Sequence, residues 1–129
     1  MAEREPARVL IVDDASLVRL YYRDALEGAG FAVEEALNGL EALERLSLAP
    51  VDLLIVDINM PRMDGLTFLR LLRRQPGPNA TIPALVTSTE AADHDFAAAR
   101  AAGANFYLVK PIGQDVLVEH AALLCGLPA

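Results

Sequence analysis

Five short aliphatic segments alternate with five segments of helical spacing, and this alternation limits the possible folds more than any other feature of the chain. The aliphatic segments lie at residues 8–12, 31–35, 53–57, 84–87 and 105–109. The first and third are almost continuously aliphatic, which is typical of strands that are buried on both faces. The sequence therefore predicts an α/β protein with a parallel sheet and helices on both sides of it.

Segments with helical spacing fill the intervals between the predicted strands. Between residues 18 and 29, apolar side chains recur every three or four positions, which places them on one stripe of a helix. Asn38 is suited to cap a second helix, which ends near residue 48 because Pro50 follows. Three further helices are expected at residues 66–74, 91–102 and 115–124. Because crossovers between parallel strands are right-handed, only a few topologies remain.

Composition restricts the class of protein. The chain has 129 residues, so we expect one domain over residues 1–129 with an ordered core at about 7–125. No apolar run reaches the roughly 18 residues of a membrane-spanning helix. A net charge of −7 at pH 7 would repel a polyanion, so direct nucleic-acid binding is disfavoured. Cys125 is the single cysteine and the first six residues contain no apolar signal core, so we expect a cytoplasmic protein.

Polar side chains with reactive groups stand at the carboxyl ends of four predicted strands. They are Asp13 and Asp14 after the first strand, Asp57 after the third, Thr87 and Ser88 after the fourth, and Lys110 after the fifth. In open parallel sheets, ligands bind outside the carboxyl ends of the strands. We therefore expect these groups to converge at one edge of the sheet.

Three converging carboxylates would repel one another. A pair of charges at about 4 Å costs roughly 1–4 kcal/mol, and Lys110 offsets only one of the three charges. A divalent cation would relieve the repulsion. Oxygen ligands in a shallow, wet site favour Mg²⁺ over Ca²⁺, and no His or Cys stands among them, which disfavours zinc.

A carboxylate beside Mg²⁺ is also a nucleophile toward phosphorus. Phosphoryl transfer needs such a nucleophile, a metal ion and donors for the phosphoryl oxygens. Asp57 would attack, Thr87 would donate its hydroxyl, and Lys110 would pair with the added charge. No general base that would expel the phosphate afterwards is evident, so these residues indicate a phosphate acceptor.

Four motifs in this order resemble the receiver domain of the bacterial response-regulator family, over essentially the whole chain. They are the acidic pair at 13–14, the segment 54–65 around Asp57, the segment 86–88 around Thr87, and the segment 102–111 that ends in Lys110-Pro111. Segment 54–65 is the most specific. The resemblance implies a single-domain receiver with a CheY-like (flavodoxin-like) fold: a doubly wound (βα)5 sheet of five parallel strands in the order 2-1-3-4-5.

The resemblance also implies a role for each acid. Asp57 would accept a phosphoryl group from a phosphohistidine on a sensor histidine kinase or a histidine phosphotransfer protein. Asp13 and Asp14 would hold Mg²⁺ together with Asp57, one of them through water. The backbone carbonyl of Asn59 would be a further metal ligand.

The remaining implied roles concern the switch. Thr87 and Lys110 would bind the phosphoryl oxygens, and the Lys110–Pro111 peptide bond would be cis. Tyr107 would be an aromatic switch that changes rotamer when Thr87 moves. A downstream protein would bind the face formed by the fourth helix, fifth strand and fifth helix (residues 91–124). We expect a monomer or a weak dimer, with no direct nucleic-acid binding and no membrane insertion.

Two features depart from the common family pattern. Pro83 stands four residues before Thr87, one closer than is usual, and proline cannot donate in a central strand. We therefore expect the fourth strand to begin at or after Pro83. Asn59 and Thr89 occupy the two positions that flank the phosphoryl group in the family and influence how fast it is lost.

Two alternative functions remain open. An aspartate-nucleophile phosphatase would share the strand-end acid, but it needs a second acid where Asn59 stands. A receiver that works by docking alone is disfavoured because every acceptor-site residue is present. A dinucleotide-binding domain is excluded because residues 13–16 are not a glycine-rich turn.

His94 and His120 have no motif spacing and are expected at the surface.

Overall fold

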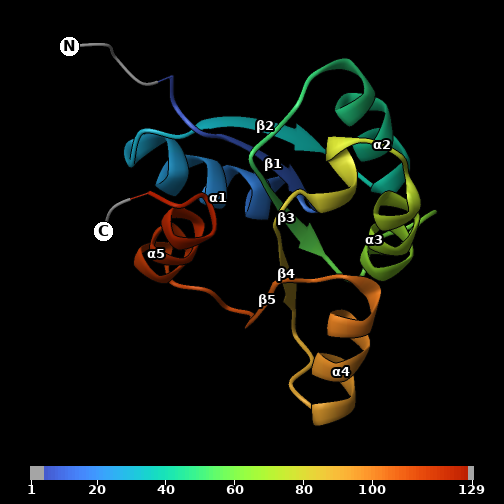
Figure 1. The fold of residues 1–129 in the computed structure, drawn as a ribbon. Helices are drawn as coiled ribbons and strands as arrows, with labels where there is room; N and C mark the ends of the chain where they lie inside the picture. The colour runs from blue at the N-terminus through green and yellow to red at the C-terminus, as the bar shows by residue number, and fades with distance from the viewer. Residues whose placement is uncertain (1–4, 128–129) are drawn as a thin grey trace.

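The computed structural model describes residues 5–127, which form five parallel strands alternating with five α-helices (Figure 1). The strands are β1 (Arg8–Val12), β2 (Ala32–Ala36), β3 (Leu53–Asp57), β4 (Ala84–Ser88) and β5 (Phe106–Val109). The helices are α1 (Ser16–Gly28), α2 (Gly39–Leu48), α3 (Gly65–Arg74), α4 (Asp93–Ala102) and α5 (Gln114–Leu124), with a short 3-10 helix, η1 (Pro78–Thr81), after α3. The expected domain of residues 1–129 includes residues 1–4 and 128–129, which lie outside the described part.

The strands lie in the order β2-β1-β3-β4-β5, which confirms the predicted sheet and its topology. The chain first winds outward from β1 to β2 and then returns to β3 on the other side of β1. The carboxyl ends of β1 and β3 therefore flank the point where the strand order reverses. In such a sheet, a ligand site is expected outside these strand ends.

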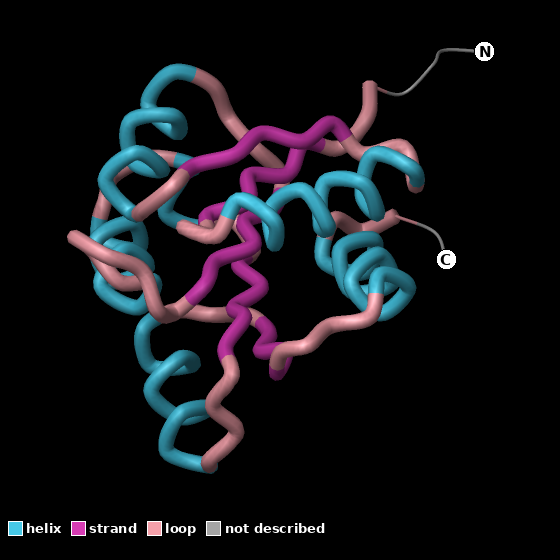
Figure 2. Tube along the Cα trace, turned by 180° about the vertical axis from the view of Figure 1, so that it is seen from behind, coloured by secondary structure: helices cyan, strands magenta, loops and turns pink. Residues whose placement is uncertain are grey.

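The helices cover the sheet on both faces. In Figure 1, α1 and α5 lie on one side of the sheet, and α2, α3 and α4 lie on the other. Figure 2, seen from behind, shows the same three layers with the strands in the middle. None of the helices within residues 5–127 combines the length and the apolar character needed to cross a bilayer.

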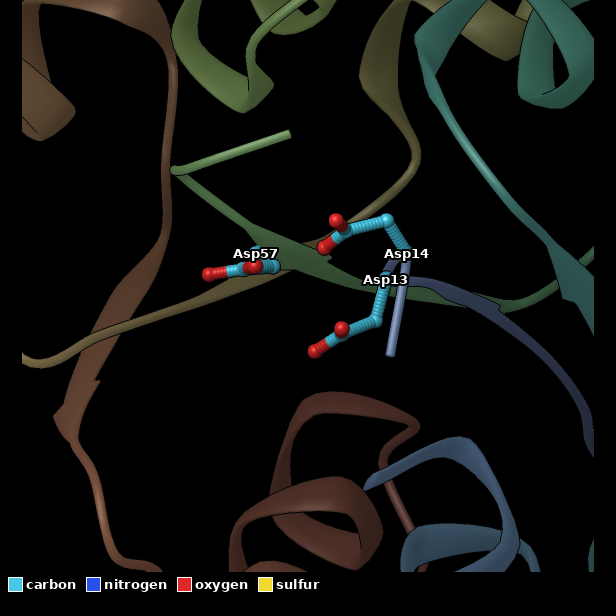
Figure 3. A group of neighbouring side chains, drawn as sticks. All are labelled: Asp13, Asp14 and Asp57. Carbon is cyan, nitrogen blue, oxygen red and sulfur yellow. The ribbon is translucent and has the colours of Figure 1, made fainter. Parts of the chain in front are cut away.

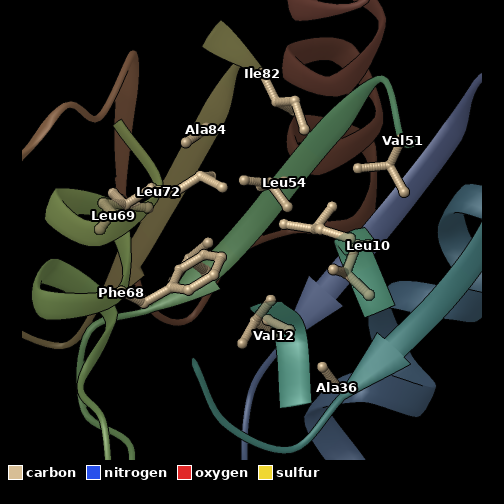
Figure 4. Packing of buried hydrophobic residues seen from close by; sticks show 14 of the residues in the cluster. Leu10, Val12, Ala36, Val51, Leu54, Phe68, Leu69, Leu72, Ile82 and Ala84 are labelled. Atoms are coloured by element: carbon tan, nitrogen blue, oxygen red, sulfur yellow. The ribbon is translucent and has the colours of Figure 1, made fainter. Parts of the chain in front are cut away.

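Alternation along the central strands explains their continuous aliphatic sequences. Leu10 and Leu54 pack with Phe68 of α3 on the side covered by α2, α3 and α4 (Figure 4). Their neighbours Val9 and Ile55 point to the other face, toward α1 and α5. Because both faces are buried, every position in these strands must be apolar until the strand ends.

Two strand boundaries show how the sequence sets the register. β4 begins at Ala84, directly after Pro83, as predicted, and the Pro83 carbonyl accepts a hydrogen bond from the Leu54 amide at 2.9 Å. β2 begins at Ala32, one residue later than predicted, because the Phe31 amide donates to the Leu26 carbonyl and so belongs to the end of α1. Pairing with β1 then runs from Arg8–Ala32 to Val12–Ala36.

Candidate functional site

Three carboxylates gather at the carboxyl ends of β1 and β3 (Figure 3). Asp13 and Asp14 directly follow β1, and Asp57 is the last residue of β3. One oxygen of each lies within 4.8 Å of the others. Asp13 and Asp57 are 1% and 6% exposed, whereas Asp14 is open to solvent. The topology thus brings together acids that are more than 40 residues apart in sequence.

The loop after β1 is held by hydrogen bonds that orient Asp13. Its Oδ1 accepts from the Ala15 amide at 2.9 Å, and its own amide donates to the Ala36 carbonyl at 3.1 Å. Arg19 of α1 donates to the Asp13 carbonyl at 2.7 Å and forms an ion pair with Glu35 of β2 at 2.7 Å. The Asp13 carboxylate is therefore fixed in direction before any ligand arrives.

Lys110 is the cation of the site. Its Nζ lies 3.2 Å from Asp13 Oδ2 and 3.4 Å from Asp57 Oδ1, so one ammonium group contacts both buried acids. The Lys110 amide donates to the Ser88 carbonyl at 2.7 Å, and the Lys110–Pro111 peptide bond is cis. One lysine against three carboxylates leaves the pocket with an excess of negative charge.

The electrostatic setting of Asp57 disfavours its ionised form. Burial raises the pKa of the Asp57 carboxyl above its usual value, and the neighbouring Asp13 raises it further. Lys110 and the Asn59 amide, which lies 3.4 Å from Asp57 Oδ1, lower the pKa but do not reverse the shift. Added positive charge at this site would therefore stabilise the ionised Asp57 carboxylate.

The ligands at the site fit a hard divalent ion. The groups that converge here are carboxylates, and the backbone carbonyl of Asn59 lies two residues beyond Asp57 in the following loop. Such oxygen ligands, with one side of the pocket open at Asp14, suit Mg²⁺.

Thr87 supplies a buried hydroxyl beside Asp57. It lies opposite Asp57 in the β3–β4 register and is fully buried. Within residues 5–127, its Oγ1 is a buried side-chain atom without a hydrogen-bond partner. By contrast, the neighbouring Ser88 Oγ accepts from the Glu90 amide at 3.0 Å. A buried hydroxyl that lacks a partner costs about 1–3 kcal/mol, so Thr87 is the hydroxyl available to a ligand.

The loop after β3 passes very close to the site. The Gly65 amide donates to the Ile58 carbonyl at 2.9 Å, and a Cβ at position 65 would collide with the Asp57 carbonyl oxygen. Asp64 then caps α3 by accepting from the Thr67 amide at 2.9 Å. Glycine is therefore required at position 65 for the chain to turn back past Asp57 into α3.

Tyr107 lies outside the acidic pocket. Its hydroxyl donates to the Glu90 carbonyl at 2.8 Å, and its ring packs edge-on against Phe96 of α4 with 4.7 Å between centroids. Tyr107 thus joins β5 to the loop between β4 and α4, the loop that begins directly after Thr87 and Ser88. Of the two histidines expected at the surface, His94 is exposed, whereas His120 is half-buried and its ring packs at an angle of 57° against Phe106.

One residue near the site was not among the candidates. Tyr22 of α1 is only 3% exposed, and the pKa of its phenol is raised by burial and then by Asp13 and Asp57. In the sequence it is one member of the apolar stripe between residues 18 and 29. The stripe indicates that Tyr22 faces the sheet but does not reveal that its hydroxyl lies near the acids.

Comparisons with known proteins agree with this geometry. The family model described as "Response regulator receiver domain" matches residues 9–122. The sensor protein EvgS of Escherichia coli (strain K12) is 37% identical over 120 residues, which are 93% of this chain and 10% of that protein. The CAI-1 autoinducer sensor kinase/phosphatase CqsS of Vibrio cholerae is 32% identical over 119 residues, which are 92% of this chain and 17% of that protein. The chain thus spans less than a fifth of the length of these curated relatives.

A solved structure shows the same fold. The chemotaxis protein CheY4 of Vibrio cholerae superposes with a TM-score of 0.86 and 34% identity, covering 92% of this chain and 98% of that chain. The resemblance expected from the four motifs is confirmed. Because the family model covers most of the chain and these relatives exceed 30% identity, the chain belongs to the response regulator receiver domain family.

Proposed function

We propose that this chain is a phosphorylation-dependent signalling switch that accepts a phosphoryl group on Asp57. The observation that carries the proposal is the convergence of Asp57 with Asp13, Asp14 and Lys110 at the carboxyl edge of the sheet. Receiver domains are in general signalling phosphoacceptors rather than enzymes. The relatives that are named sensor proteins support a sensor histidine kinase, or a histidine phosphotransfer protein, as the donor.

The chemistry follows from the positions of three side chains. An Asp57 oxygen attacks the phosphorus of a phosphohistidine, the P–N bond breaks, and the imidazole nitrogen leaves with the electron pair and takes up a proton. Lys110, already 3.4 Å from Asp57, pairs with the charge that the acceptor gains. The unpartnered Thr87 hydroxyl donates to a phosphoryl oxygen.

Asp13, Asp14, Asp57 and the Asn59 carbonyl would hold Mg²⁺. When bound, the ion neutralises charge on the acids and on the transferring group. Asp13 enters this role already oriented by the Ala15 amide. The exposed Asp14 leaves one side of the pocket open, through which a donor histidine can approach.

The output is a change at the face formed by α4, β5 and α5. Phosphorylation adds about −1.5 to −2 charge at neutral pH and draws the Thr87 hydroxyl toward Asp57. Thr87 precedes the loop whose Glu90 carbonyl accepts from Tyr107. A shift of this loop would therefore reposition Tyr107 against Phe96, and a downstream protein would read that change.

Acetyl phosphate tests the proposal directly. The protein is incubated with this donor with and without Mg²⁺, and its intact mass is measured. We expect one added phosphoryl group that depends on Mg²⁺ and is absent from Asp57→Asn. Asp24→Asn, which changes an exposed acid of α1 in the same way, is the matched control and should be labelled like wild type.

Each contrary outcome counts against a different part of the proposal. Labelling that persists in Asp57→Asn would contradict Asp57 as the acceptor. Release of more phosphate than there is protein, from any phosphate ester, would favour the phosphatase alternative. A wild-type chain that takes up no phosphoryl group at all would favour a receiver that works by docking.

A further inference from the structure

We propose that Tyr22 is a positioning residue for Thr87: its phenol donates a hydrogen bond to Thr87 Oγ1 in the phosphorylated state, when Thr87 itself donates to the phosphoryl group. The inference rests on the proposed function, since it concerns how Thr87 binds that group. It adds a sixth side chain, from α1, to a site otherwise built from strand ends and their loops.

The position of Tyr22 places it beneath the site. It packs on the inner face of α1 in the same apolar cluster as Ile55, Leu85 and Ile112, the first two of which lie two residues before Asp57 and Thr87 on their strands. Tyr22 and Lys110 also line the same cavity of about 640 Å³. Because side chains alternate along a strand, Asp57 and Thr87 point to the same face of the sheet as Ile55 and Leu85, the face that Tyr22 covers.

The two hydroxyl groups are neighbours that do not bond in this structure. Thr87 points to the same face of β4 as Leu85, which is the face that Tyr22 covers. In agreement with this placement, the Thr87 hydroxyl acts on the pKa of Tyr22 as a nearby hydrogen-bonding group and lowers it, although burial and the two acids raise it more. Yet Thr87 Oγ1 has no hydrogen-bond partner among the residues at 5–127. The pair is therefore close enough to form after a small movement of Thr87, while the present state leaves Thr87 unsatisfied.

Hydrogen-bond capacity explains why the pair would form on phosphorylation. A threonine hydroxyl has one proton to donate and two lone pairs that accept. Once its proton is directed at a phosphoryl oxygen, a lone pair remains for a donor. Tyrosine carries its proton at neutral pH, since its usual pKa is about 10 and this environment raises it. A phenol donating to Thr87 also strengthens Thr87 as a donor, because linked hydrogen bonds polarise one another.

A thermodynamic cycle with beryllium fluoride, a non-covalent mimic of the phosphoryl group, tests the inference. Calorimetry with saturating Mg²⁺ gives the affinity of the mimic for each variant. Tyr22→Phe should weaken binding by about two- to tenfold, the effect of one hydrogen bond. In a Thr87→Ala background the same change should have no further effect, whereas in a Thr87→Ser background, which keeps the hydroxyl, it should again weaken binding.

The controls separate this role from a structural one. Tyr21→Phe removes the same group from the neighbouring tyrosine, which is 43% exposed, and should bind the mimic like wild type. Melting curves without the mimic check that Tyr22→Phe remains folded. A Tyr22→Phe affinity equal to wild type, or a loss that persists in Thr87→Ala, would overturn the inference. A wild-type protein that does not bind the mimic would instead overturn the proposed function.

Discussion

Asp57 shares a buried pocket with Asp13, and this crowding sets the properties of the site at the scale of single residues. Two acids that are almost fully buried meet one lysine, and a third acid lies within 4.8 Å. In the absence of metal the fold therefore carries unfavourable charge repulsion. The proposed phosphoacceptor, Asp57, is therefore also a residue that destabilises the unliganded protein.

Asp57→Asn should stabilise the metal-free fold by about 1–3 kcal/mol at neutral pH, because it removes one charge from the cluster. The gain should shrink as the pH falls. Since the pKa of Asp57 is raised in the folded state, its ionisation penalises folding fully above that raised pKa and not at all below the unfolded value near 4. Urea unfolding of both proteins between neutral pH and about pH 4 measures the difference.

The difference in stability between wild type and Asp57→Asn is free of the contributions of groups that titrate in both proteins. Burial raises the pKa of Glu35, but hydrogen bonds from Arg19 and Arg23 hold it below its usual value, so Glu35 contributes stability that is lost on acidification. That contribution is common to both proteins and cancels in the difference. Asp24→Asn should change stability little at any pH. An Asp57→Asn variant that is less stable than wild type at neutral pH would contradict the account of crowded charge.

The acidic cluster could be predicted from sequence, whereas the helical side chains that pack near the acids or against Tyr107 could not. Asp13, Asp57 and Lys110 stand at strand ends, and in a parallel sheet the topology alone brings such ends to one edge. Tyr22, which lies near the acids, and Phe96, which packs against Tyr107 outside the acidic cluster, both belong to helices. Which point of the sheet a helical side chain meets depends on how the helix packs, and no local pattern encodes that.

At the scale of elements, Arg73 links three parts of the fold. From the last turn of α3, its guanidinium donates to the Gly103 carbonyl at 3.1 and 2.8 Å, to the Ala80 carbonyl of η1 at 3.1 Å and to Asn105 Oδ1 at 3.2 Å. Gly103 is the left-handed residue that ends α4, and a Cβ there would meet the Arg73 side chain. Arg73 therefore fixes the junction between α4 and β5.

Arg73→Leu should destabilise the fold by about 2–3 kcal/mol, since it keeps much of the apolar stem but leaves partly buried carbonyls without their donor. Arg74→Leu makes the same change at the adjacent exposed position and should cost little. Denaturant midpoints of the two variants give the comparison. Equal midpoints would show that the Arg73 hydrogen bonds contribute nothing to stability.

Sequence patterns located the elements better than their ends and connections. Pro83 predicts the start of β4 because proline cannot donate in the ladder. The apolar pattern predicts the start of β2 at Phe31, one residue early, because Phe31 looks like a strand residue although its amide completes the end of α1. The sequence predicts that α3 ends near residue 74, but it does not predict the short helix η1 that follows. A single 3-10 turn (Pro78–Thr81) that receives one donor from Arg73 has no periodicity of its own.

At the scale of the whole molecule, a metal that binds only the folded state should stabilise it. Mg²⁺ at tenfold its dissociation constant adds about 1.4 kcal/mol, because the unfolded chain disperses Asp13, Asp14 and Asp57. The melting temperature of wild type should therefore rise with Mg²⁺. Sodium chloride at matched ionic strength is the control for screening of the net charge of −7. Equal shifts with both salts would count against a specific site.

The central claim is that Asp57, among three neighbouring acids, forms the bond to phosphorus. Borohydride reduces an acyl phosphate to an alcohol, so treatment after acetyl phosphate and Mg²⁺ converts the phosphorylated aspartate to homoserine. Peptide mapping by mass spectrometry then locates the converted residue. We predict homoserine at position 57 and unmodified aspartate at positions 13 and 14; conversion at 13 or 14 with residue 57 intact would contradict the account.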